Sequence, residues 1–233
     1  MHRRRHHRFA GLARADNLAR MVRILRWIMI GLAAAVFAGW GALWLHQAGL
    51  GQAIRSAAGI DTPEGPPPGG AQVGGPFSLI DQTGQPVTDA TWRGSWMLVY
   101  FGYTTCPDLC PTELQTIAAA LDALGNQAPR VVPIFITIDP DRDTPGRLAD
   151  YVKLFDDRLV GLTGTPAQIE AVARAYRVYY AKVTRTDSAT YLMDHSSFLY
   201  LVGPDGRLRA RFRSGATAEE LAKAIRSRLP AAG

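Results

Sequence analysis

Cysteine is scarce in this chain of 233 residues, which contains only Cys106 and Cys110, four positions apart. Histidine is scarce as well, because beyond the N-terminal segment and His46 only His195 remains. A disulfide between two such close cysteines would restrict the unfolded chain little, so a purely structural bridge explains the pair poorly. The two thiols point instead to redox chemistry or to metal binding.

Acidic residues are nearly missing from residues 1–26, which contain eight arginines and one carboxylate, Asp16. The formal net charge of +6 therefore belongs to this tail, and the rest of the chain is close to neutral. A folded domain that binds nucleic acid needs a basic face, so we do not expect nucleic acid as a partner. His2, His6 and His7 lie among these arginines, which repel cations, and we do not expect them to bind a metal.

Formal charge is missing altogether from Trp27 to Leu45, a run close to the ~20 residues that span a bilayer as a helix. Arginines flank this run only on its N-terminal side, which predicts a cytoplasmic N-terminus and an exported C-terminal part. A cleaved signal peptide is the alternative, but the run is long for one and no small-x-small cleavage site follows it. We therefore expect a cytoplasmic basic tail at 1–23 and a single-pass transmembrane signal-anchor helix at 24–45, in the inner membrane.

Residues 46–75 lack the apolar side chains needed to order a segment, and they are rich in glycine and proline. We expect a flexible linker there, followed by one periplasmic domain at 76–233. In this domain, apolar runs alternate with helical patterns, which predicts an α/β fold with a mostly parallel sheet and an antiparallel hairpin at its end. The expected strands are 77–80, 96–103, 131–138, 160–164, 197–202 and 208–212. The expected helices are 111–124, 145–155, 166–176 and 217–229. We expect an irregular insertion at 179–190.

Cys106 and Cys110 lie between a buried strand and the start of a helix. Residues four apart at a helix start share a face, and helix N-terminal amides stabilise a thiolate. Such a pair can form a reversible disulfide, or it can bind a soft ion such as Cu(I) or Zn(II). Two ligands are too few for a closed site, and His195 is the candidate third ligand because it precedes an apolar strand expected to lie beside the cysteine strand.

Three stretches in this order resemble the Sco/SenC family: 102–111 (GYTTCPDLCP), 139–145 (DPDRDTP) and 194–200 (DHSSFLY). The resemblance covers roughly residues 72 to 230. It implies a membrane-anchored, thioredoxin-like domain, with a mixed central sheet flanked by helices, that binds copper through two cysteines and one histidine. It also implies a role in building the CuA centre of cytochrome c oxidase subunit II. On this chain the implied copper ligands are Cys106, Cys110 and His195.

Several polar residues near these motifs have open roles. Thr105 stands where many family members have histidine, and we interpret it as tuning the site rather than as a ligand. Asp194 either orients His195, lies near the metal, or is an ordinary turn carboxylate. We expect the three aspartates of the 139–145 stretch to fix their loop and to cap the next helix.

Two functions follow from these residues. The first is a copper chaperone, rather than an enzyme, which carries Cu(I) or Cu(II) and depends on a periplasmic copper donor and on a thioredoxin-like thiol reductant. The second is a periplasmic thiol-disulfide reductase that keeps the CuA cysteines reduced, with Cys106 and Cys110 as its redox pair. Oxidoreductases of the thioredoxin type usually carry Cys-x-x-Cys and a facing cis-proline, whereas this chain has a longer spacing and Ser196-Ser197. A peroxidase is disfavoured because no proline lies between Pro86 and Cys106.

Overall fold

The computed structural model describes residues 25–37, 39–40, 73–184 and 191–229. The chain divides into two compact units, Met1–Gly59 and Ile60–Gly233. In the first unit, residues 25–37 and 39–40 are helical and exposed. None of the helices in the described ranges has both the length and the apolar character that crossing a membrane requires. The predicted tail at 1–23 and most of the predicted linker lie outside the described residues, and the anchor stays a prediction.

The second unit is built on a seven-stranded sheet with the order β2-β1-β5-β4-β3-β8-β9. Its strands are β1 (Ser78–Asp81), β2 (Pro86–Thr88), β3 (Trp96–Gly102), β4 (Val131–Thr137), β5 (Val160–Thr163), β8 (Phe198–Val202) and β9 (Leu208–Arg213). Only β3, β4 and β5 run parallel to one another, and the other neighbouring pairs are antiparallel. The mixed central sheet is therefore confirmed, while the expectation of a mostly parallel one is wrong, because strands from both ends of the domain add antiparallel edges.

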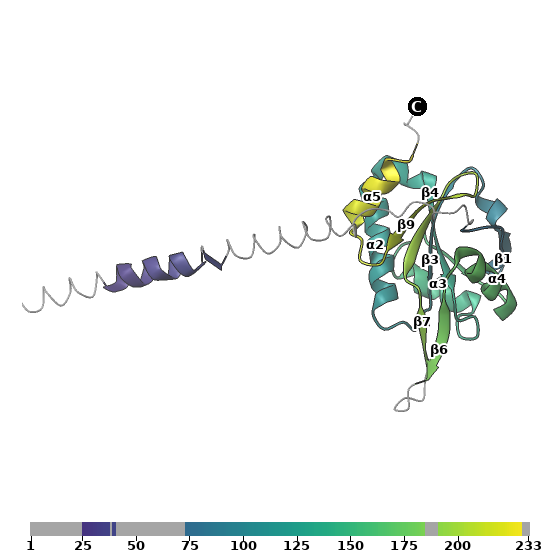
Figure 1. Ribbon diagram of the computed structural model, residues 1–233, viewed down its shortest axis with the longest axis horizontal. Helices are drawn as coiled ribbons and strands as arrows, with labels where there is room; N and C mark the ends of the chain where they lie inside the picture. The colour runs from purple at the N-terminus through teal and green to yellow at the C-terminus, as the bar shows by residue number, and fades with distance from the viewer. Residues whose placement is uncertain (1–24, 38, 41–72, 185–190, 230–233) are drawn as a thin grey trace, which may run out of the picture. The chain divides into compact units, whose positions relative to one another are not determined.

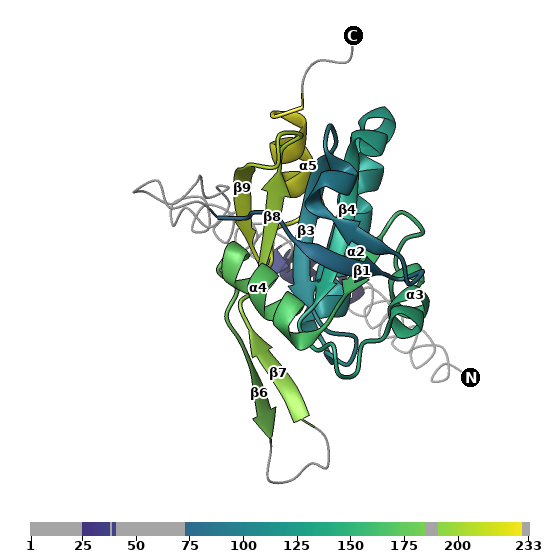
Figure 2. The ribbon, with the colours of Figure 1, turned by 90° about the vertical axis from the view of Figure 1, so that its right-hand side faces the viewer.

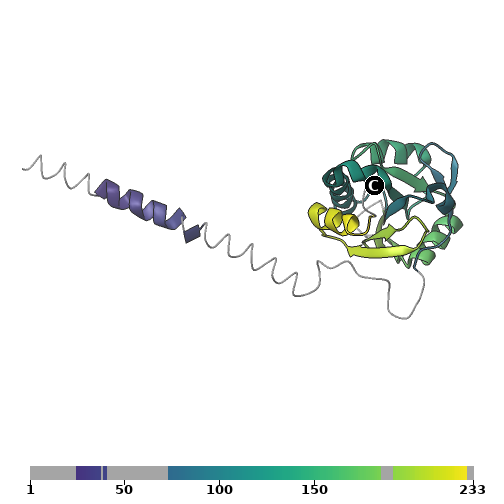
Figure 3. The same cartoon turned by 90° about the horizontal axis from the view of Figure 1, so that it is seen from above.

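The helices of this unit are α2 (Leu109–Leu124), α3 (Pro145–Lys153), α4 (Pro166–Tyr176) and α5 (Ala218–Arg226), with short 3-10 turns η1 (Asp89–Trp92) and η2 (Gly125–Arg130). Three of the four begin after a threonine whose side chain accepts the hydrogen bond of an early helical amide, namely Thr144, Thr165 and Thr217. Figures 2 and 3 show α4 on the opposite face of the sheet from α2 and α5. The sheet is thus covered on both faces, which explains why all seven residues of β3 are buried.

A second, two-stranded sheet is formed by β6 (Tyr180–Thr184) and β7 (Tyr191–His195), which pair antiparallel with Tyr180 opposite His195. Figures 1 and 2 show this hairpin projecting beyond the main sheet. The expectation of an irregular insertion at 179–190 is wrong for the described part of that segment. Tyr180 and Ala181 are adjacent apolar residues, so β6 lacks the strict period-two alternation of a half-buried strand in its sequence.

Candidate metal centre

The two cysteines lie where β3 passes into α2. Cys106 is half-buried in the connecting loop, and Cys110 is buried in the first turn of α2. The helix begins at Leu109, two residues before the predicted start, but Cys106 still lies outside it, so the two cysteines do not share a helical face as expected. The two sulfur atoms come together because the loop turns back over the helix start. There the Cys110 amide donates a hydrogen bond to Cys106 Sγ at 3.3 Å. Both are free thiols in this structure.

His195 approaches the same point from the base of the β6–β7 hairpin. Its Nε2 atom lies 3.7 Å from Cys110 Sγ, and its Nδ1 atom lies 3.1 Å from the carbonyl oxygen of Ser196. A carbonyl can only accept, so this contact requires the proton on Nδ1 and leaves the lone pair of the neutral ring on Nε2. Tyr100 and Tyr103 pack edge-on against the imidazole, with ring centroids 6.4 and 6.0 Å away. The ring is therefore held with its free nitrogen toward the sulfurs.

The three ligand atoms all lie within 4.8 Å of one another, and they form the one group of this kind found among the described residues. Bonds of about 2.3 Å to sulfur and about 2.0 Å to nitrogen, meeting at about 120°, separate the two ligand atoms by about 3.7 Å. The observed distance between Cys110 Sγ and His195 Nε2 is 3.7 Å. The donor set of two thiols and one imidazole suits a soft ion. The residues present therefore fit a metal site with three protein ligands, as the sequence predicts.

The two thiols differ strongly in acidity. The pKa of Cys106 is lowered to about 3, chiefly by a hydrogen bond from the Cys110 thiol and further by its contact with the His195 imidazole and by hydrogen bonds from helix-start amides. The pKa of Cys110 is raised, because that thiol donates to Cys106, is buried, and lies beside the negative charge of Cys106. Cys106 is thus a thiolate at neutral pH, and Cys110 keeps its proton in the metal-free protein.

Two residues of β3 that the sequence interpretation missed shape the floor of the site. The hydroxyl of Tyr100 donates to Cys110 Sγ at 3.7 Å, and burial beside this sulfur raises the tyrosine pKa. A side chain at Gly102 would place its Cβ atom 2.8 Å from Cys110 Sγ and 2.8 Å from the ring of Phe135. Strand alternation could have identified both, because Tyr100 and Gly102 are two apart and so face the same side of the sheet.

The loop that follows β4 holds the cysteine loop in place. Asp143 is fully buried, and its carboxylate accepts hydrogen bonds from the Thr104 amide (3.0 Å), the Thr104 hydroxyl (2.6 Å) and the Thr137 hydroxyl (2.6 Å). The expectation that aspartates fix this region is confirmed here. The expectation that they cap the next helix is wrong, because the hydroxyl of Thr144 accepts from the Arg147 amide at the start of α3.

Asp194 and Thr105 do not belong to the ligand group. Asp194 is exposed on β7, opposite Ala181, and the partner that orients His195 is the Ser196 carbonyl. Asp194 is part of strand β7, so it is not the turn carboxylate of the third alternative. Thr105 is half-buried, and its hydroxyl oxygen lacks a hydrogen-bond partner in the described part of the chain.

The comparisons with known proteins identify the family of this chain. A family model described as SCO1/SenC matches residues 65–230. The chain belongs to the SCO1/SenC family. It is 50% identical over 147 residues to "Protein SCO1 homolog 1, mitochondrial" of Arabidopsis thaliana, covering 63% of this chain and 44% of that protein. It is 44% identical over 155 residues to "Protein SCO1 homolog, mitochondrial" of Homo sapiens, covering 66% of this chain and 52% of the human protein. The chain thus spans about half the length of these curated relatives.

Solved Sco structures share the fold of the second unit. The crystal structure of Arabidopsis thaliana ScoI with copper bound matches with a TM-score of 0.63 and 44% identity, covering 66% of this chain and 95% of that one. The structure of Bradyrhizobium japonicum ScoI with copper bound matches with a TM-score of 0.63 and 46% identity, covering 67% of this chain and 99% of that one. The family resemblance and the thioredoxin-like mixed sheet with flanking helices are therefore confirmed. These two Sco relatives carry copper, and this chain has a Cys-Cys-His group suited to a metal.

Proposed function

We propose that this protein is a copper chaperone that binds one copper ion through Cys106 Sγ, Cys110 Sγ and His195 Nε2. One observation carries the proposal: these three ligand atoms lie within 4.8 Å of one another in a chain whose family members have been solved with copper bound. Copper is the cargo, and we propose that it is delivered to the CuA site of cytochrome c oxidase subunit II during assembly.

The difference in acidity between Cys106 and Cys110 indicates the order in which the two thiols bind copper. Cys106 is already a thiolate, so it supplies the first anionic ligand without losing a proton. Cys110 must release its proton as the ion binds, which makes loading less favourable as the pH falls. Three protein ligands leave the ion open to an incoming thiolate or imidazole of the recipient, and stepwise ligand exchange then passes the ion on. Both thiols must be reduced first, so a periplasmic copper donor and a thioredoxin-like reductant are the partners we infer.

We further propose the membrane arrangement that the sequence predicts. The copper-binding domain at 76–233 lies on the periplasmic side of the inner membrane. It is tethered there by a cytoplasmic tail at 1–23, an anchor at 24–45 and a linker at 46–75. The arginines of the tail and the uncharged run that follows support this orientation. The tether keeps the domain close to a membrane-bound oxidase.

A second candidate function is thiol-disulfide reduction at the CuA cysteines, and the difference in thiol acidity favours it. The half-buried Cys106 thiolate can attack a disulfide sulfur of the client and form a mixed disulfide, which releases one client thiolate. Cys110 then loses its proton and attacks Cys106 Sγ, which releases the second client thiol and leaves a Cys106–Cys110 disulfide. An external dithiol reductant must restore the pair.

Copper stoichiometry separates the two functions. The reduced wild-type protein should hold close to one copper ion per chain against a mild chelator, and its Cu(II) form should show sulfur-to-copper charge-transfer absorption. The His195→Ala variant should bind copper far more weakly while its thiol reduction potential changes little. Equal copper affinity in wild type and His195→Ala would disprove the three-ligand site. Catalytic disulfide reduction by a metal-free protein that retains no copper would favour the reductase.

A further inference from the structure

The hairpin that carries His195 is only loosely packed on the rest of its domain. It forms a sheet of its own, and Met193 is its one buried residue among those described. A cavity of about 140 Å³ separates the hairpin from the loop after β4 and the start of α4, with Ile138, Pro166 and Tyr180 among its lining residues. Met193 and the partly buried Tyr180 and Tyr191 pack against the core, but this apolar contact is limited, so polar contacts contribute to the position of His195.

Several of these contacts converge on Tyr191, at the other end of β7 from His195. Its hydroxyl donates to Asp139 Oδ1 at 2.7 Å, and its carbonyl oxygen accepts from Arg142 Nη1 at 3.0 Å. The Arg142 guanidinium also lies over the Tyr191 ring, 3.7 Å from its centroid. Asp139 is fully buried, and it accepts a hydrogen bond from Arg142 Nε. These contacts clamp β7 to the loop after β4.

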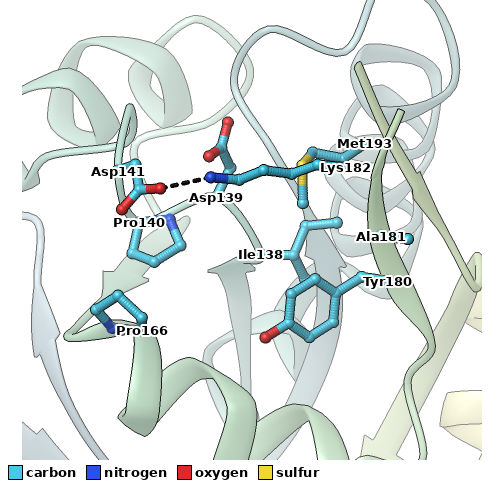
Figure 4. A pocket seen from close by; sticks show the side chains of 9 residues that line it. All are labelled: Ile138, Asp139, Pro140, Asp141, Pro166, Tyr180, Ala181, Lys182 and Met193. Atoms are coloured by element: carbon cyan, nitrogen blue, oxygen red, sulfur yellow. Dashed lines mark hydrogen bonds and ion pairs between the residues drawn. The ribbon is translucent and has the colours of Figure 1, made fainter. Parts of the chain in front are cut away.

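The contact at the other strand of the hairpin is weaker. Lys182 Nζ lies 2.6 Å from Asp141 Oδ2, beside the cavity (Figure 4), but both side chains are about half exposed, at 51% and 55%. Exposed ion pairs of this kind contribute little. Arg142 is different, since its side chain is only 21% exposed and its Nη2 atom is buried without a hydrogen-bond partner among the described residues. Its charge is balanced by buried Asp139 and by the aromatic face of Tyr191.

The same loop also holds the cysteine side of the site. Asp143 fixes Thr104, two residues before Cys106, and the Arg142 guanidinium lies 5.9 Å from the centroid of the Tyr103 ring. Tyr103 in turn packs edge-on against His195. One five-residue loop, 139–143, therefore contacts both the segment that presents the sulfurs and the strand that presents the imidazole.

We propose that Arg142 is a positioning residue, which acts through Tyr191 to hold His195 at the distance that lets it bind together with the two cysteines. The proposal rests on the proposed copper site, and it assigns Arg142 no contact with the ion. Without these contacts, the hairpin can move across the cavity and carry His195 away from the cysteines. The site then has only two ligands, Cys106 and Cys110. Supporting residues around metal ligands change affinity by about 10–100-fold when they are removed.

A double-mutant cycle on the full reduced chain tests this. The Arg142→Met variant should lose copper about 10–100-fold faster than wild type, and the nitrogen hyperfine signal of its Cu(II) form should weaken. The double variant Arg142→Met/His195→Ala should lose copper no faster than His195→Ala alone, because the two rings that Arg142 contacts, Tyr191 and Tyr103, both act on the position of that histidine. Arg142→Lys keeps the charge but cannot bridge Asp139 and the Tyr191 carbonyl together, so it should recover only part of the loss. Arg158→Met is the matched control, since Arg158 pairs with Asp156 and Asp122 and should leave copper release unchanged.

Each outcome decides a separate question. If wild type holds no copper, the proposed function fails before the clamp is considered. If His195→Ala releases copper quickly but Arg142→Met does not, or if the two effects add in the double variant, the clamp is wrong and the copper site stands. If Arg142→Met does not fold, Tyr191→Phe removes only the hydroxyl bonded to Asp139, and it should speed copper release several-fold with the same dependence on His195.

Discussion

At the scale of single residues, Cys106 and Cys110 have opposite acidities although they are the same residue type. Cys106 accepts hydrogen bonds from the Cys110 thiol and from backbone amides and contacts the His195 imidazole, and all of these favour its anion. Cys110 is buried beside that anion, so a second negative charge is disfavoured. In either proposed function this difference sets the order of events, because Cys106 reacts or binds first and Cys110 follows.

The acidity of Cys106 predicts an unusual pH dependence of alkylation. An ordinary thiol with a pKa near ~8.5 loses about tenfold in rate for each pH unit below that value. Because the pKa of Cys106 is lowered to about 3, its thiolate fraction should stay constant between about pH 8 and about pH 5, and so should its rate with iodoacetamide. Mass spectrometry of the labelled peptide measures this rate. In Cys110→Ala the pH at which the alkylation rate begins to fall should be higher than in wild type. A tenfold fall in the wild-type rate per pH unit between about pH 8 and about pH 5 would contradict the lowered pKa of Cys106.

Gly102 predicts a steric effect on the ligand sulfur. In Gly102→Ala the new methyl group would lie 2.8 Å from both Cys110 Sγ and the Phe135 ring, so one of them must move. We expect a loss of about 1–3 kcal/mol in the free energy of unfolding, together with faster copper release. Urea denaturation and chelator competition measure the two effects. Gly146→Ala is the control, since a Cβ atom there meets nothing within 4 Å, and equal behaviour of the two variants would contradict the crowding.

At the scale of structural elements, the loop at 139–143 connects parts of the fold that are far apart in sequence. It leaves the carboxyl end of β4 in the middle of the sheet, which brings it beside the cysteine loop that follows β3. Two of its three aspartates, Asp139 and Asp143, turn inward and are fully buried. A buried carboxylate is tolerated only when donors surround it, and here these donors are the groups that hold the site.

Removing the carboxylate of Asp143 should therefore loosen the cysteine loop. In Asp143→Ala the Thr104 amide and the Thr137 hydroxyl lose a charged acceptor, and we expect the free energy of unfolding to fall by roughly 2–4 kcal/mol. Chemical denaturation followed by circular dichroism measures this change. Asp157→Ala, at an exposed aspartate, should change it by less than about 0.5 kcal/mol. A similar small effect in Asp143→Ala would show that the carboxylate does not support the loop.

Local sequence signals explain which elements could be predicted. Thr144-Pro145 and Thr165-Pro166 carry a capping side chain and a fixed proline φ, and both helices begin where these residues predict. α2 has no side-chain cap, and its start was misplaced by two residues. The sequence does not predict the β6–β7 hairpin, because Met193 is the one buried residue among those described there and burial follows no alternating pattern.

At the scale of the whole molecule, the chain consists of two compact units whose boundary lies between Gly59 and Ile60. The described part of the second unit contains all three candidate ligands, and its core lies between the sheet and the helices on both faces. Copper binding should therefore not require the first unit, whereas membrane attachment should depend on it.

Deleting residues 1–59 separates these two properties. The remaining chain should bind the same number of copper ions as the full chain and unfold at a similar denaturant concentration, because the described core is intact. Cell fractionation should find the full chain with the membranes after alkaline carbonate washing, and the truncated chain in the soluble fraction. A truncated chain that stays in the washed membranes would contradict the proposed anchor, and loss of copper binding would contradict a self-contained domain.

The sequence by itself determined the α/β class, most element positions and the three candidate ligands. Hydrophobic periodicity, helix starts and rare residue types are local signals, and Cys106, Cys110 and His195 stand out because their residue types are scarce. Only the tertiary structure decided the mixed strand order, the opposite acidities of the two thiols, and the contacts that join Arg142 to Tyr191. Those features depend on burial and on distances between segments far apart in the chain, and no short-range pattern records either quantity.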